Sequence, residues 1–194
     1  MSATIDLNIV SRESIGIKYM IEFLTSEFGF DLKINNIEVM DNWEYENVID
    51  GLEINVVQQY IEEGKIANIE LLESNKNRIG FQIEKTRGGY ETDIWIDTAN
   101  LSYLDYDYID DENKFFYKKI INVVSELVKK FKIIVATIGI ETVFEYNSNL
   151  AKMINDSKNI IVWIIVGDYP QCMENYSLTE NKQLDIGIFI KNKS

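Results

Sequence analysis

The chain has 194 residues, a formal net charge of −13 and no histidine. Its length and its hydrophobic fraction of 46% predict one soluble globular domain that folds without disulfides, since Cys172 is the single cysteine. The lack of histidine excludes Ser-His and Cys-His nucleophilic sites and HExxH zinc sites, and it removes the usual pH switch near neutrality.

Neither export nor membrane insertion is indicated by the pattern of the chain. Met1–Val10 has neither a basic region nor a sustained apolar run, which argues against a cleaved signal peptide. The longest apolar runs, Ile133–Ile140 and Ile160–Val166, are far shorter than the ~20 residues of a membrane-spanning helix. With a single cysteine, these features predict a cytoplasmic protein that does not contact a membrane.

The first third of the chain predicts two strands and two helices. Thr4–Val10 alternates apolar and polar residues, as a half-buried strand does. Apolar residues between Ile17 and Phe28 recur at three- and four-residue spacing, which predicts a helix that ends at Gly29. Asn36–Met40 is expected to be a short strand, and the apolar spacing from Val56 to Ile61 predicts a short helix.

Three strands are expected in quick succession in the middle of the chain. They are Ile66–Leu72, Arg78–Lys85 and Tyr90–Asp97, and each has the alternation or the apolar content of a sheet strand. The segments that join them are short and contain Asn, Ser and Gly. Such connections predict an antiparallel meander.

The second half begins with the longest expected helix, Asp110–Phe131, which has acids at its start and lysines at its end, as the helix dipole prefers. Ile133–Ile140 and Ile160–Val166 are near-continuous apolar runs, typical of strands covered on both faces. Asn149–Asn155 offers a helix between them, so this region is a candidate βαβ crossover. Leu184–Ile190 is expected to be the last strand.

No segment has the composition of a linker between domains. Pro170 is the only proline, and no low-complexity stretch or repeat interrupts the pattern. We therefore expect residues 1–194 to form a single α+β domain, in which a mixed sheet contains the antiparallel meander and helices pack on it.

The acidic residues are segregated. Ile34–Gly64 and Gly88–Asn113 each contain eight acids and no Lys or Arg, so each has a charge of −8. The rest of the chain has the other 16 acids and all 19 bases, a charge of +3. Two acidic segments of this kind predict a cationic partner and argue against nucleic-acid binding, because phosphates would be repelled.

The densest acidic run, Asp105–Glu112, fails the test for a calcium loop. Such a loop needs an oxygen ligand at position 5, Gly at position 6 and Glu at position 12. Counted from Asp105, these positions hold Ile109, Asp110 and Phe116. The chain also has no GxxxxGK[ST] or GxGxxG phosphate loop. We therefore expect no metal ion, no cofactor and no catalytic residues, and we interpret the run as a solvated loop or a partner-facing surface.

Aromatic residues lie among these acids, and Trp and Tyr are the residue types that supply most contact energy at protein interfaces. Strand alternation puts Trp95 on one face with three acids, which favours an exposed position. The sequence leaves open whether Trp43 is in the core or on the surface. The residues that we expect to bind a partner are Trp43, Glu44, Asp93, Trp95, Asp97, Asp105, Tyr106, Asp107 and Tyr108.

An enzyme or regulator is the alternative. Glu141 and Glu145 follow the expected strand Ile133–Ile140, and the ends of strands in parallel sheets are a usual place for sites. A carboxylate pair near Glu141 or near Asp105 could do acid and base work. A polar strand end without any chemistry is the simpler interpretation, and a structural interaction protein is a third possibility.

Two stretches resemble the immunity proteins of bacterial polymorphic toxin systems, which are small, acidic, Tyr- and Trp-rich α/β proteins without catalytic signatures. They are Gly80–Phe116, with its strand, Asp-Tyr-rich loop and following helix, and the strand end Ile138–Glu141. The resemblance implies a non-enzymatic cytoplasmic inhibitor that binds a cognate toxin protein with a basic surface and occludes its active site or substrate groove.

Overall fold

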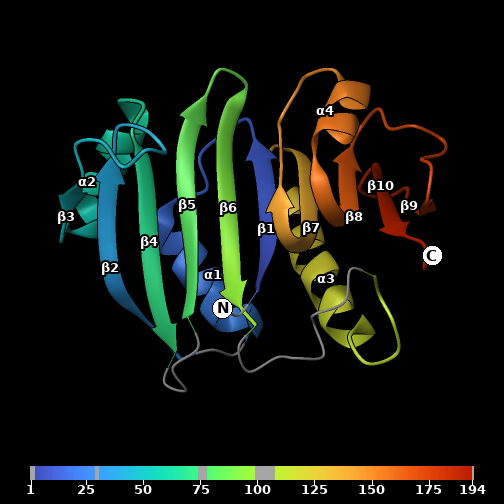
Figure 1. Cartoon of the computed structure of the whole chain (residues 1–194), viewed down its shortest axis with the longest axis horizontal. Helices are drawn as coiled ribbons and strands as arrows, with labels where there is room; N and C mark the ends of the chain where they lie inside the picture. Colours follow the sequence, from blue (N-terminus) through green and yellow to red (C-terminus); the bar gives the residue numbers. More distant parts are fainter. Residues whose placement is uncertain (1–2, 29–30, 74–77, 99–107, 194) are drawn as a thin grey trace.

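The computed structural model describes residues 3–28, 31–73, 78–98 and 108–193, which form one ten-stranded sheet and four helices (Figure 1). The strands are β1 (Thr4–Ser11), β2 (Leu32–Met40), β3 (Ile49–Asp50), β4 (Ile66–Glu73), β5 (Arg78–Thr86), β6 (Gly89–Asp97), β7 (Ile133–Val143), β8 (Lys158–Val166), β9 (Tyr176–Asn181) and β10 (Ile186–Lys191). The helices are α1 (Ile17–Phe28), α2 (Ile54–Glu62), α3 (Lys114–Lys130) and α4 (Leu150–Asp156). The α+β class is confirmed.

The strands are ordered β3-β2-β4-β5-β6-β1-β7-β8-β10-β9 across the sheet. The meander predicted for β4, β5 and β6 is confirmed, and Phe81 of β5 pairs with Ile69 on one side and Ile94 on the other. These three side chains point into the main core, which also takes the buried faces of α1, α2 and α3. Figure 1 shows α1 and α3 behind the sheet, and α2 packs on the same core, so these three helices cover one face of the sheet, whereas α4 packs on the other.

The N-terminal strand β1 lies in the middle of the sheet, between β6 and β7. Its alternate residues Ile5, Leu7 and Ile9 enter the core beneath the helices. The residues between them, among them Asp6 and Asn8, point to the opposite face, yet they are only 7% and 8% exposed. Two polar side chains are therefore buried in the centre of the molecule, and they need hydrogen-bond partners there.

The crossover predicted between Ile133 and Val166 is wrong, because β7 and β8 are adjacent and antiparallel. A parallel crossover must bring the chain back along the whole of β7, which has eleven residues and therefore spans about 36 Å. Helix α4 has seven residues and covers only about 10 Å. The chain therefore turns back at the end of β7. The sheet was predicted to be mixed, but every strand pair of the described sheet is antiparallel.

Helix α3 begins at Lys114, four residues later than predicted from Asp110. The acids before it form a turn: Asp110 Oδ1 accepts hydrogen bonds from the backbone N–H groups of Glu112 and Asn113, at 2.9 and 3.0 Å. Asn113 Oδ1 accepts one from Asp110 N–H at 2.8 Å. Asp and Asn side chains favour such turns over the first helical turn, because they bond the nearby backbone.

The face opposite α1, α2 and α3 has two unlike halves. Over β7, β8 and β10 it is apolar, and Val135, Trp163 and Phe189 form a second core beneath Met153 of α4. Over β4, β5, β6 and β1 the paired residues are mostly polar, and no helix of the described chain covers them (Figure 1). We call this polar half the open face.

A glycine in β7 permits a close backbone approach beside the open face. A Cβ on Gly139 would lie 2.0 Å from the carbonyl oxygen of Asn159, a backbone atom that cannot move aside. We predict that Gly139→Ala lowers the free energy of unfolding by about 1–3 kcal/mol, as overpacked sites do. Gly16→Ala is the matched control, since nothing lies within 4 Å of its new Cβ. Urea denaturation of both variants measures this, and equal midpoints would contradict the proposed clash.

Candidate functional site

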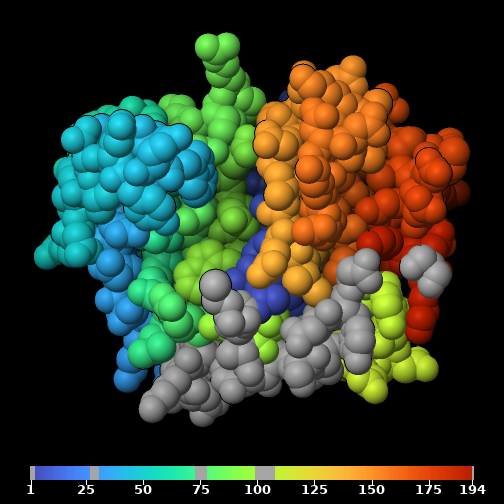
Figure 2. Space-filling view, viewed as in Figure 1, coloured from blue at the N-terminus to red at the C-terminus, as the bar shows by residue number. Residues whose placement is uncertain are grey.

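A cleft of about 550 Å³ lies on the open face, between two projecting segments of the chain. Figure 2 shows the hollow between the green strands β5 and β6 and the orange segment that follows β7, with blue β1 in its depth. We call it the acidic cleft; its side chains include Asn8, Trp43, Glu84, Glu91, Asp93, Thr142, Phe144, Glu145 and Tyr146. It has four acids and no Lys or Arg in its lining.

The register of three strands brings the floor of the cleft together. Asp93 of β6 lies opposite Asn8 of β1, and Glu91 of β6 lies opposite Glu84 of β5. Directly paired residues of antiparallel strands project from the same face. The three carboxylates therefore share a surface with Asn8 although they come from separate strands.

One wall of the cleft is fixed by the two buried polar residues of β1. Asp6 Oδ2 accepts hydrogen bonds from the Thr142 backbone N–H at 2.6 Å and from the Thr142 hydroxyl at 3.2 Å. Asn8 Nδ2 donates to Thr142 Oγ1 at 2.9 Å and to Thr137 Oγ1 at 3.1 Å. The chain just before Thr142 is bulged, with Glu141 at a φ of 45°. The polar side chains of β1 thus position the segment that continues to Tyr146.

The opposite rim is a loop between β2 and β3 that carries Trp43. Asn42 Oδ1 accepts the backbone N–H groups of Glu44 and Glu46, at 3.1 and 3.3 Å, and Lys65 pairs with Asp41. Trp43 is 49% exposed, so its position is on the surface rather than in the core. Trp43 and Glu84 both line the cleft, and the Trp43 side chain partly offsets the rise that burial causes in the pKa of Glu84, so the rim lies against the floor.

Burial raises the pKa of all three acids on the floor, and like charge adds to the rise for Glu91 and Asp93. Burial, followed by the charges of Glu84 and Glu145, raises the pKa of Glu91 to about 7. Burial, followed by the charge of Asp6, raises the pKa of Asp93 to about 7. The Asp93 atom Oδ1 is buried and has no hydrogen-bond partner among the described residues. Such groups exchange a proton at neutral pH and favour a cation beside them.

The structure brings together only part of the predicted partner-binding set. Asp93 lies in the cleft, Trp43 is on its rim, and Glu44 is exposed beside Trp43. Trp95 and Asp97 share the face of Asp93 but lie outside the cleft.

Trp95 is half-buried, because its ring lies over Gly80, where a Cβ would come within 2.3 Å of it. Tyr108 lies before α3 with Lys193 Nζ 4.6 Å from its ring centroid, and it does not line the cleft. The remaining three predicted residues, Asp105, Tyr106 and Asp107, lie outside the described residues.

Several cleft residues were missing from the predicted set. Asn8 and Thr142 give no local signal, because their role depends on β1 lying between β6 and β7. Glu84 and Glu91 could have been found from the alternation of β5 and β6, which puts both on the face of Asp93. Of the acids named for an enzyme site, Glu145 lines the cleft, whereas Glu141 does not.

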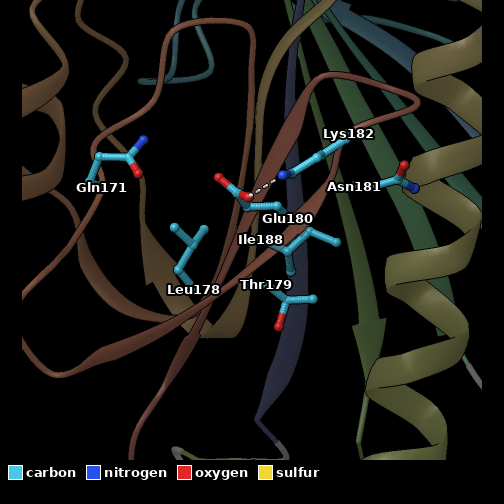
Figure 3. A pocket seen from close by; sticks show the side chains of 7 residues that line it. All are labelled: Gln171, Leu178, Thr179, Glu180, Asn181, Lys182 and Ile188. Carbon is cyan, nitrogen blue, oxygen red and sulfur yellow. Dashed lines mark ion pairs between the residues drawn. The ribbon is translucent and has the colours of Figure 1, made fainter.

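A larger and shallower hollow of about 870 Å³ lies beside the edge strand β9. Figure 3 shows its lining, in which Glu180 and Lys182 form an ion pair at 4.0 Å. Glu180 also accepts a hydrogen bond from the Tyr169 hydroxyl at 3.2 Å. Its charges already have partners within the chain, so the acidic cleft is the stronger candidate site.

Comparison with protein-family models, with curated proteins and with solved structures gave no match for this chain. Among the described residues, no three His, Cys, Asp or Glu side chains are grouped so that they could hold a metal ion. None of the described helices is both long and apolar enough to cross a membrane.

The raised pKa of Asp93 predicts a specific pH dependence of stability. The unfolded chain ionises Asp93 near pH 3.8, whereas the folded chain keeps the proton to about 7. Folding stability therefore falls as the pH rises from about 4 to about 7, and the loss is complete above 7. We predict that Asp93→Asn is more stable than the wild type by about 2 kcal/mol at pH 8, less than the full shift implies because water still reaches the side chain.

Thermal or urea unfolding between pH 4 and pH 8 measures this difference, which should shrink toward zero at the acid end. Asp111→Asn is the matched control, because Asp111 is exposed and Lys114 lowers its pKa. A stability gain for Asp93→Asn that is the same at pH 5 and pH 8 would contradict the assignment.

Proposed function

We propose that this protein is an inhibitor that binds a basic surface of another protein with the acidic cleft and the loop at its rim. The observation that supports this best is the lining of the cleft: the carboxylates of Glu84, Glu91 and Asp93 lie beneath an aromatic rim, and no Lys or Arg lines the hollow. A cationic group from a partner would supply the missing countercharge.

The rim loop has the features of a preformed binding surface. Trp43, Tyr45 and Val48 are exposed on it, at 49%, 56% and 41%, and acids lie between them in the sequence. Hydrogen bonds within the loop order it although Tyr45 has a φ of 60°. An ordered aromatic loop loses little conformational entropy on binding, so more of its contact energy contributes to affinity.

We further propose that the partner is the toxin domain of a bacterial polymorphic toxin system, neutralised in the cytoplasm by occlusion of its active site or substrate groove. The resemblance of Gly80–Phe116 and Ile138–Glu141 to immunity proteins supports this proposal. Occlusion also needs no chemistry from the inhibitor, in agreement with a surface built from charge and aromatic rings. The same charge would keep nucleic acids away.

A second candidate function is acid and base catalysis in the same cleft. Glu91 and Asp93 project from one face of β6, with Cα atoms about 7 Å apart, and both have a pKa of about 7. Carboxyl groups with such values can give and take protons at neutral pH. Turnover of a small neutral substrate by the wild type, and its loss when either Glu91 or Asp93 is replaced, would favour the enzyme over the inhibitor.

The inhibitor proposal is tested with a candidate partner, which is the protein that the wild-type chain captures from an extract of its source cells. We predict that this partner is toxic when expressed alone and harmless when co-expressed with the chain. Trp43→Ala should weaken binding by ~2 kcal/mol, mainly through faster dissociation, because Trp43 is an aromatic anchor. Glu44→Lys should instead slow association and flatten its salt dependence.

Surface plasmon resonance at two salt concentrations separates these effects. Phe115→Ala is the control for Trp43, since Phe115 is 79% exposed but belongs to α3, outside the cleft. Glu22→Lys on α1 is the control for Glu44→Lys. Equal losses in the test and control variants, or a captured partner whose toxicity the chain does not change, would overturn the proposal.

A further inference from the structure

We propose that the acidic cleft is a receptor for one arginine side chain of the partner, whose guanidinium enters between Trp43 and Tyr146 and pairs with Asp93 and Glu91. This inference rests on the proposed function, and it adds the chemical group that the cleft recognises. Its basis is the combination of shape, unpartnered buried oxygen and aromatic walls in one hollow.

The floor of the cleft has an acceptor that no group of the protein satisfies. Asp93 Oδ1 is buried without a hydrogen-bond partner among the described residues, whereas the neighbouring polar side chains Asp6 and Asn8 are bonded to Thr142. A buried acceptor without a donor costs about 1–3 kcal/mol, and more when it is charged. A ligand with N–H donors and a positive charge would remove that cost.

The walls of the cleft favour a flat cation with an apolar stem. Trp43 lies at one side, next to Glu84, and Phe144 and Tyr146 lie at the other. The Tyr146 ring is also held in place, because it packs within 2.6 Å of the position that a Cβ on Gly88 would take. Arginine combines a planar guanidinium, which stacks on aromatic rings, with an alkyl stem that can line an apolar wall.

The spacing of the acids favours guanidinium over a compact cation. Glu91 and Asp93 leave β6 two residues apart, so their Cα atoms are about 7 Å from each other. No three acids of the described chain are grouped to hold a metal ion. A guanidinium has five N–H donors spread over a plane and is weakly hydrated, so it can reach two separated carboxylates at a lower desolvation cost than an ammonium.

Binding of this cation should be linked to the release of protons. The titratable groups that face Asp93 and Glu91 are acids from every neighbouring strand: Asp6 on β1, Glu84 on β5 and Glu145 after β7. A guanidinium binds the ionised floor, and the pKa values of Glu91 and Asp93 lie at about 7. Affinity should therefore rise between pH 6 and pH 8, by about tenfold for each group that must ionise.

The experiment is a titration of the isolated chain with N-acetyl-arginine amide. The readout is the NMR signal of the Trp43 indole N–H, which is assigned by its absence from the spectrum of Trp43→Phe. We expect saturable binding in the millimolar range at pH 8, about tenfold or more weaker at pH 6. N-acetyl-lysine amide should bind at least fivefold more weakly than the arginine probe. N-acetyl-citrulline amide, which has the same shape without the charge, should not bind.

Asp93→Asn should weaken binding of the arginine probe at least tenfold, and Asp111→Asn should leave it unchanged. Unchanged binding in Asp93→Asn, equal binding of lysine and arginine, or the absence of a saturable shift would overturn the inference. No partner protein is present in this assay. If the arginine probe does not bind but the partner still binds in a Trp43-dependent way, only the arginine-receptor inference is refuted. If the probe binds but no toxic partner is captured, the inhibitor proposal is refuted.

Discussion

The hydrogen bonds from the central strand to Thr142 are the constraint on which the cleft depends. Strand β1 joins the meander to the β7–β10 half of the sheet, so Asp6 and Asn8 lie where the two halves meet. Each of these buried side chains bonds Thr142, at 2.6 Å from Asp6 and 2.9 Å from Asn8. Without those bonds Asp6 would lose its Thr142 donors and Asn8 would keep only Thr137. The wall from Thr142 to Tyr146 would also lose its link to the central strand. The same contacts therefore stabilise the sheet and shape its open face.

The sequence predicted local structure well, because periodicity encodes which face a strand residue occupies. Asp93, Trp95 and Asp97 do share one face of β6, as the alternation indicated. Strand β9 was missed because Tyr176–Asn181 is an edge strand whose apolar alternation is limited to Tyr176 and Leu178. The pairing of Asn8 with Asp93 and with Thr137 joins residues far apart in the chain, and no local period specifies such neighbours. For this reason the sequence identified acids of the cleft but not the cleft itself.

Retention of the acidic floor needs an explanation, because it destabilises the fold. Asp93 could be replaced by a neutral residue of the same shape without loss of a hydrogen bond at Oδ1, which has no partner among the described residues. Structural ion pairs do not account for the floor either, since no Lys or Arg lines it. Groups that lower stability and have no structural partner are typical of sites kept for function.

Proton binding reconciles that cost with a stable free protein. With pKa values of about 7, Glu91 and Asp93 are only partly ionised in the free chain at neutral pH. The electrostatic repulsion between the floor acids is therefore weaker than it would be if both were fully charged. An approaching cation lowers both pKa values, and the floor becomes fully charged as it is filled. The exposed acids of the rim loop lie outside the cleft, where they could steer a partner from a distance. The acids of the rim loop would thus steer the partner, whereas Glu91 and Asp93 would anchor it. These two carboxyl groups would become fully ionised only when the partner's cation lies beside them.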